Sequence, residues 1–292
     1  MPSVHRAPGL TGDWLNGWLA ALGITVLVPS ARLCFDGDGV PTAVVELDGG
    51  IGLDEAVAAA LPTTADLEEL AIARSRLSQH VFVDDYRQAA SAARATRDWS
   101  LSSSVTDLGK ERNNKGLPHS RFDLPAQGDR PLWVRLIDCR NALGSGDGMQ
   151  SLIARSLTGR GARIKASGLG FDYRRISAAA NGPGKIRVDP VVECLAFYGL
   201  ALFPVRGDSV HSLTRGWRWH AASRQSRLTW PTWRASLDRF GIDALLGAVF
   251  ASGDDRSTLT RLGVQALFET ITYTPPPLSK DITSGYGSRR LW

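Results

Sequence analysis

Apolar residues dominate one segment near the N-terminus and are arranged in two ways. From Asp13 to Leu22 they recur at the spacing of a buried helix, whereas Ile24 to Val28 is a continuous run rich in β-branched residues. Gly23 separates the two parts, and glycine commonly ends helices. The pattern therefore predicts a helix over 13–22, with Asp13 as its N-cap, and a buried strand over 24–28.

A hairpin and a second helix follow in the sequence. The runs RLCF (32–35) and TAVVEL (42–47) flank Gly37-Asp38-Gly39, which is typical of the turn between two paired strands. Residues 53–61 have the composition and spacing of a helix, and Pro62 ends it.

The same order of elements returns after residue 187, where an aspartate again opens an apolar helix that a glycine ends. The aligned positions are Asp13 with Asp189, Leu19 with Leu195, and Gly23 with Gly199. A later helix beginning at Gly241 corresponds to the one beginning at Gly52. We therefore predict an internal duplication of roughly 11–62 and 187–252, each copy a helix, a strand, a hairpin and a helix.

The remaining patterns complete an α+β prediction. Helical spacing covers 64–98, 149–157 and 259–268, an apolar run over 131–137 predicts a strand, and a polar tail follows Pro275. Two related helix–strand–hairpin–helix lobes would surround mixed or antiparallel sheets, with a helical middle segment. The predicted divisions are an acidic N-terminal lobe with a helical extension (1–100), a loop-rich basic middle region (101–186), and a basic C-terminal lobe and tail (187–292).

Arginine and tryptophan alternate between residues 215 and 239, in the place of the second hairpin. Basic groups neutralise phosphates and aromatic faces stack on bases, so this composition favours a nucleic-acid surface. Trp217 and Trp219 also alternate at strand period, which is equally typical of a half-buried strand. Because the first copy has a plain hairpin here, inward tryptophans and outward arginines can coexist, and the arginines are the stronger functional candidates.

Charge is distributed unevenly along the 292 residues, whose net charge is +5. Residues 1–70 contain two Lys/Arg and ten Asp/Glu, which leaves 32 basic and 19 acidic residues in the rest of the chain. A basic body of this kind favours an anionic polymer as partner. The three widely spaced cysteines favour a reducing cytoplasm over a disulfide framework or a structural zinc site, and the apolar run of 14–28 is too short to span a membrane.

Two glycine-rich loops, TGRGAR (158–163) and SGLGF (167–171), lie beside basic residues. Exposed backbone N–H groups and arginines are suited to phosphate. Neither loop has the spacing of a nucleotide-binding motif, so the sequence predicts no bound cofactor.

Catalysis has weaker support. The five histidines show no metal-ligand spacing, and no serine-nucleophile motif is present. We expect no catalytic residues and no metal. The alternatives are a stand-alone nuclease that uses His119, Asp123 and His220, and an assembly scaffold whose basic face meets an acidic protein.

The phrases GDWLNGWLAALGITVLVP, VDPVVECLAFYGLALFPV, GLGFDYRR and SRLTWPTW before GIDALLGAVF resemble subunits of type I-G (formerly I-U) CRISPR interference (Cascade) complexes. The resemblance implies an RNA-guided assembly for antiviral defence, in which this chain is large-subunit-like. Its partners would be guide RNA, target DNA, the other subunits and a helicase-nuclease recruited in trans. It would help to recognise the motif that flanks the target and to hold the opened strands, without cleaving them.

The expected nucleic-acid contacts fall into three groups. Within the Trp/Arg stretch, the predicted phosphate ligands are Arg215, Arg218, Arg224, Arg227 and Arg234, and either Trp217 or Trp219 would stack on a base or wedge the duplex. Residues that would extend this track are Arg174, Arg175, Lys185 and Arg187. In the tail, backbone or subunit contacts would come from Lys280, Arg289 and Arg290.

Overall fold

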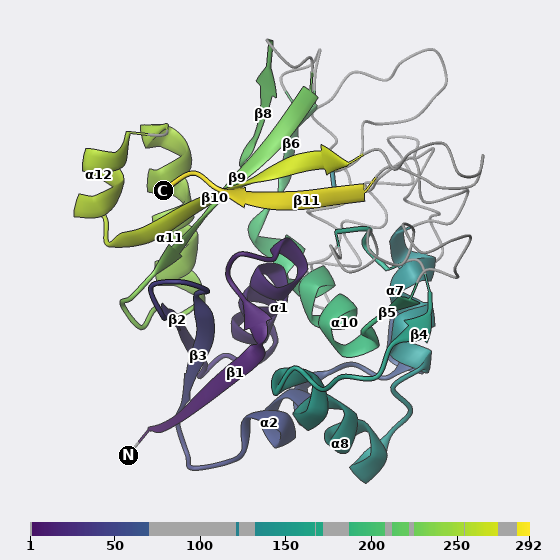
Figure 1. Ribbon diagram of the computed structural model, residues 1–292. Coiled ribbons are helices and arrows are strands. Elements are labelled where there is room, and N and C mark those ends of the chain that lie inside the picture. The colour runs from purple at the N-terminus through teal and green to yellow at the C-terminus, as the bar shows by residue number, and fades with distance from the viewer. Residues whose placement is uncertain are drawn as a thin grey trace, which may run out of the picture.

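Helices and antiparallel sheets make up the computed structural model, which confirms the α+β class (Figure 1). The structure describes residues 2–69, 121–122, 132–166, 168–171, 187–207, 212–221, 225–253, 255–273 and 285–292. The predicted helical segment beyond residue 69 and the polar loop of 100–128 lie largely outside this description.

The N-terminal sheet has the strand order β1-β3-β2. Its strands are β1 (Ser3–Thr11), β2 (Arg32–Asp36) and β3 (Thr42–Leu47), all antiparallel. The β2–β3 hairpin confirms the predicted turn, in which Gly37 has a φ of 106°. Helix α2 (Leu53–Ala60) is also confirmed, and α3 (Thr64–Glu69) follows it.

Helix α1 (Leu15–Leu27) corrects two expectations. It continues through Gly23, so the predicted strand over 24–28 is wrong, and it begins after Trp14 without a side-chain cap, so Asp13 is not its N-cap. Its residues from Leu15 to Thr25 are all buried, and tertiary packing outweighs the weak helix propensity of its β-branched residues. Within the described part of the chain, no helix has the length and apolarity that a membrane crossing needs.

Helix α10 (Pro190–Gly199) packs against α1, and the two helices lie near the centre of Figure 1. They approach through a reciprocal glycine contact. A Cβ added at Gly23 would lie 2.7 Å from the carbonyl carbon of Leu195, and one added at Gly199 would lie 3.0 Å from that of Leu19. Each glycine therefore contacts the leucine that the sequence alignment pairs with the leucine of its own helix: Gly23 contacts Leu195, and Gly199 contacts Leu19. The contact is thus reciprocal, and a duplication as the origin of the two helices stays a prediction.

The start of α10 has the predicted chemistry. The Asp189 carboxylate accepts hydrogen bonds from the backbone N–H groups of Val191 and Val192, and Pro190 occupies the first turn. A 3₁₀ turn, η2 (Leu200–Leu202), extends the helix beyond Gly199.

The middle region is helical where a strand was expected. Residues 132–141 form α7 (Leu132–Asn141), so the predicted strand over 131–137 is wrong. Its buried Leu136 and Cys139, with Leu143 just beyond, are spaced by three and four residues, and a short apolar run had hidden this helical period. The predicted short helix is present as α8 (Gly146–Leu157). Two antiparallel ribbons complete the connections: β4 (Ile164–Lys165) with β5 (Arg187–Val188), and β6 (Val205–Gly207) with β7 (Ser212–Thr214).

The C-terminal sheet has the strand order β11-β10-β9-β8. Its strands are β8 (Trp217–His220), β9 (Gln225–Trp233), β10 (Val264–Tyr273) and β11 (Gly285–Arg290), with helices α11 (Arg239–Ser252) and α12 (Arg256–Arg261) between β9 and β10. The helix predicted over 259–268 overlaps α12 only as far as Arg261 and is wrong beyond it, because Gly263 turns the chain at a φ of 82° and β10 begins one residue later. The end of the tail is ordered by its pairing with β10.

One hydrophobic core joins the two sheets. The Trp18 ring of α1 lies 6.2 Å from that of Trp230 and 5.7 Å from that of Phe203. Leu33 and Leu237 exchange backbone hydrogen bonds of 2.8 and 3.0 Å, which connects β2 to the segment after β9. The division at residues 100 and 186 stays a prediction, but the described parts of all three regions contribute to this core.

We expect Gly23→Ala to lower the free energy of unfolding by about 1–3 kcal/mol, the usual cost of overpacking a core. The methyl group would push α1 away from the Leu195 carbonyl, and this outweighs the helix propensity gained. Urea unfolding measures the change. The matched control is Gly148→Ala in α8, where a Cβ meets nothing within 4 Å; it should be neutral or stabilise by up to about 1 kcal/mol. Equal effects at the two positions would contradict the packing argument.

Candidate nucleic-acid interface

The Trp/Arg stretch forms the β8–β9 hairpin, as predicted. Its register pairs Trp217 with Leu228 and Arg218 with Arg227. Gly216 precedes the hairpin at a φ of 81°, and a Cβ there would lie 2.8 Å from the side chain of Leu228. Trp217 and Arg218 are successive residues of β8, so the alternation of the strand directs their side chains to opposite faces of the sheet.

The four tryptophans of the stretch divide into three that pack in the core and one that does not. Trp230 and Trp233 are fully buried, and their Nε1–H groups donate to Gly12 O (2.8 Å) and Leu33 O (3.0 Å) in the N-terminal region. Trp217 is half-buried, with its ring 5.5 Å from that of Phe122. Trp219 is 65% exposed. The core interpretation thus holds for three rings, and Trp219 is the one that remains accessible.

Several of the predicted phosphate ligands are bonded within the protein. Arg215 pairs with Asp243 and donates to Leu202 O at 3.0 Å. Arg218 donates to Phe250 O at 2.5 Å, a carbonyl in the last turn of α11, where a cation also interacts favourably with the helix dipole.

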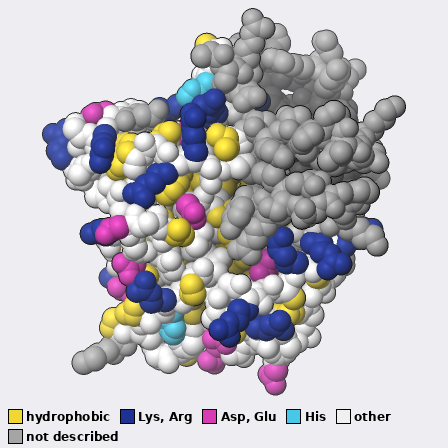
Figure 2. Space-filling view, viewed as in Figure 1, with side chains coloured by type: hydrophobic (Ala, Val, Ile, Leu, Met, Phe, Trp, Pro, Cys, Tyr) yellow, Lys and Arg dark blue, Asp and Glu magenta, His cyan; other side chains and the backbone are white. Residues whose placement is uncertain are grey.

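Arg234 and Arg290 both hold the β2–β3 turn. Arg234 forms an ion pair with the Asp38 carboxylate, and Arg290 donates to Asp38 O at 2.8 Å. Gln265 adds a hydrogen bond of 2.7 Å to Gly37 O. The acidic turn therefore lies against basic residues of the C-terminal sheet, and the uneven charge of the sequence is partly balanced inside the molecule. In Figure 2, acidic side chains are interspersed among the Lys and Arg side chains of the visible face.

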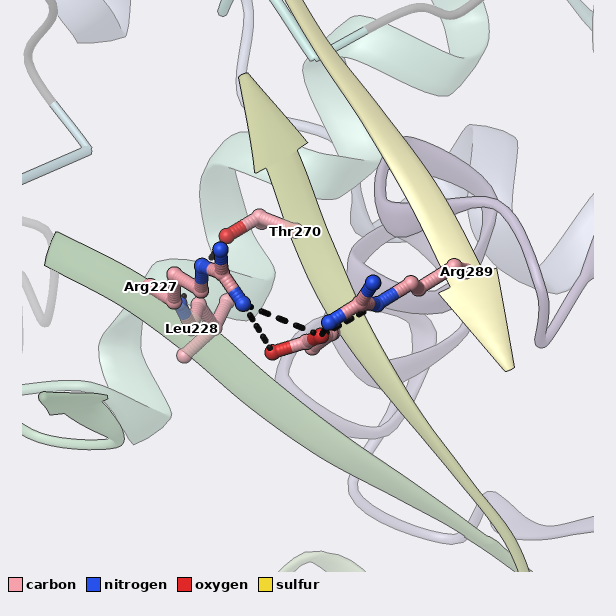
Figure 3. A network of polar contacts seen from close by, with 5 residues as sticks. Arg227, Leu228, Thr270 and Arg289 are labelled. Atoms are coloured by element: carbon pink, nitrogen blue, oxygen red, sulfur yellow. Dashed lines mark hydrogen bonds and ion pairs between the residues drawn. The ribbon is translucent and has the colours of Figure 1, made fainter. Parts of the chain in front are cut away.

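A charged row crosses the C-terminal sheet, with one residue from each strand: Arg218, Arg227, Glu269 and Arg289. Arg227 Nη1 lies 3.3 Å from both carboxylate oxygens of Glu269, and Arg289 pairs with the same carboxylate from the other side (Figure 3). Glu269 is only 3% exposed. Next to it, Thr270 accepts a hydrogen bond from the Leu228 N–H at 3.0 Å.

Glu269 was not predicted because the expected contacts were chosen from clusters of basic residues, and Glu269 is an isolated acid. The signal was present in the run FETIT, where a carboxylate interrupts a strand pattern, and a buried acid in a sheet needs a cation nearby. One carboxylate orients two arginines here, and the row as a whole has more positive than negative groups.

Other predicted residues are distributed differently. Seven of the residues predicted from the sequence lie outside the described part of the chain: Arg174, Arg175, Lys185, Arg224 and Lys280, and His119 and Asp123 of the nuclease alternative. Arg187 lies in β5, directly opposite Lys165 of β4. His220 ends β8, where it pairs with Gln225.

The glycine loops pack on the carboxylates of Asp189, the N-cap of α10, and of Glu193 within α10. A Cβ at Gly161 would lie 2.7 Å from the carboxyl carbon of Asp189, and one at Gly168 would lie 2.5 Å from that of Glu193. Glu193 also accepts the Leu169 N–H at 2.7 Å and a hydrogen bond of 2.6 Å from Asn16. These glycines are therefore explained by close approach to internal acids, and the Leu169 N–H is bonded to a carboxylate instead of facing a phosphate.

The cysteines do not offer an activated nucleophile. Burial raises the pKa of the Cys139 and Cys194 thiols, and burial together with Glu46 and Asp36 raises the pKa of Cys34. Among the residues that the structure describes, no three His, Cys, Asp or Glu side chains are grouped so that they could hold a metal ion.

Comparison of the chain with protein-family models, with curated proteins and with solved structures found no match.

We expect Glu269→Ala to destabilise the protein by about 1–3 kcal/mol, because Arg227 and Arg289 would lose their shared partner; their partial exposure places the loss below that of a fully buried pair. Chemical denaturation followed by tryptophan fluorescence measures it. Asp243→Ala serves as the control, because it removes the partner of Arg215, an acid whose side chain is 55% exposed. The expected loss of unfolding free energy is about 1 kcal/mol or less. A larger loss at Asp243 would contradict the assignment of Glu269 as the organising acid.

Proposed function

We propose that this chain is a nucleic-acid-binding subunit of an RNA-guided CRISPR effector complex, which helps to recognise target DNA and hold its opened strands. In this role it acts in the cytoplasm beside guide RNA and other subunits. A helicase-nuclease recruited in trans cleaves the target, so the chain needs no catalytic residues of its own.

The observation that carries the proposal is the exposure of Trp219 at the outer end of the β8–β9 hairpin. A large aromatic ring is costly to leave in water, and the three other tryptophans of the same stretch are packed. An exposed ring on a narrow hairpin is suited to stacking on an unpaired base or to wedging between base pairs.

The charged row offers phosphate contacts on the other face of the same sheet, because Trp219 alternates with Arg218 along β8. Arg289 is 55% exposed and uses Nε and Nη2 on Glu269, which leaves the N–H donors of Nη1 for a phosphate oxygen. Glu269 has a positioning role, since it holds the guanidinium groups of Arg227 and Arg289 in place. The resemblance to type I-G subunits agrees with a DNA partner, and the basic balance of residues 71–292 favours the same class of ligand.

Trp219→Ala should weaken binding of the full chain to a fluorescein-labelled single-stranded 20-mer by about 1–3 kcal/mol, the usual contribution of one stacked base, or about 5- to 150-fold in Kd. Trp219→Phe should retain most of the affinity. Phe240→Ala removes another exposed aromatic ring, 77% exposed at the start of α11, and should leave binding unchanged. Fluorescence anisotropy provides the measurement.

Two results would contradict the proposal. One is a wild-type chain that binds neither single-stranded nor duplex nucleic acid. The other is an equal loss on Trp219→Ala and Phe240→Ala, which would indicate that any exposed aromatic ring contributes non-specifically.

A further inference from the structure

We propose that the β4–β5 ribbon is a phosphodiester-binding site, in which Lys165 and Arg187 together take one backbone phosphate of the nucleic acid. The inference rests on the proposed function and extends it, because it assigns backbone contacts to a surface far from the Trp/Arg stretch in sequence.

The first step is the direction of the two side chains. The register pairs Ile164 with Val188 and Lys165 with Arg187. Val188 is fully buried and Ile164 packs against the core, so the alternation of the strands turns the next pair to the opposite face. Lys165 and Arg187 are both exposed, as this geometry requires.

Lys165 and Arg187 carry charges of the same sign at directly opposite positions. Like charges at directly opposite positions of an antiparallel pair repel each other and weaken the ribbon. Cross-strand neighbours of this kind have Cβ atoms about 4.5–5.5 Å apart. At this separation an ammonium and a guanidinium group can converge on the two non-bridging oxygens of one phosphate, which would turn the repulsion into joint binding.

The third step is the lack of neutralisation nearby. Among the described residues, neither Lys165 nor Arg187 forms an ion pair, in contrast to Arg215, Arg234 and Arg289.

The acids nearest to Arg187 along the chain do not neutralise its charge, because they are bonded to other groups. Asp189 accepts the Ser156 hydroxyl at 2.9 Å, and Glu193 accepts Asn16 and Leu169; both carboxylates are buried. The sequence from 151 to 188 contains eight Lys/Arg and one Asp, so positive charge predominates along the chain around this ribbon, as it does in the Trp/Arg stretch with its six Arg and one Asp. An external anion is therefore the partner that this ribbon fits.

The test compares two double variants of the full chain. Lys165→Gln with Arg187→Gln removes the proposed site, whereas Arg6→Gln with Arg32→Gln removes two exposed cations from the acidic N-terminal sheet. The dependence of log Kd on log salt concentration is measured for a duplex and for a single strand of the same sequence. If the two side chains together neutralise one phosphate, the slope should fall in magnitude by about 0.9 on duplex or about 0.7 on single-stranded nucleic acid, the usual change per neutralised phosphate.

The control double variant should keep the wild-type slope. If the wild-type chain binds but the two double variants behave alike, the ribbon is not the phosphate site, although the proposed function stands. If the wild-type chain binds no nucleic acid, the proposed function itself fails. Competition by polyglutamate as effective as competition by unlabelled DNA would also overturn the inference, since the ribbon would then recognise acidic protein.

Discussion

The backbone contact between α1 and α10 is the constraint on which the fold depends. Gly23 and Gly199 let the two helices approach until each faces a carbonyl of the other, and no side chain fits between them. This close crossing places Trp18 where it meets both Phe203 and the Trp230 ring of the C-terminal sheet. The helices are short, and nearly every residue of α1 is buried, so their stability comes from packing instead of intrinsic helix propensity.

Polar contacts then fix how the two sheets lie on this helical centre. Indole N–H groups of the C-terminal sheet donate to carbonyls of the N-terminal segment, and arginines from β11 and the end of β9 hold the acidic β2–β3 turn. These arginines therefore stabilise contacts between parts of the protein. Similarly, Asp189, Glu193 and Glu269 are buried acids that position glycine loops or arginines. Within the described residues, fewer arginines are therefore accessible than the sequence indicates, and the contacts proposed above involve Trp219, Arg289 and the β4–β5 ribbon.

Local chemistry was enough to predict part of the fold. The turn at Gly37, the proline-initiated helix after Asp189 and the β8–β9 hairpin follow from interactions within a few residues, and these the sequence specifies by itself. The alignment of Gly23 with Gly199 also anticipated a relation between two helices. It did not reveal that these glycines touch, because a helix-ending glycine and a helix-crossing glycine look identical in one sequence.

Tertiary structure decided the rest, because burial depends on neighbours that are distant along the chain. Ile24 to Val28 is strand-like by composition but mostly remains helical inside the core, and the apolar run after Pro131 shows its helical period only once its buried side is known. The same holds for the candidate interface. Trp219 and Trp230 are equivalent as residue types, and Arg187 and Arg234 carry the same charge. Only the packed structure buries Trp230, pairs Arg234 with Asp38, and leaves Trp219 and Arg187 accessible, since each outcome depends on which distant groups fold against it.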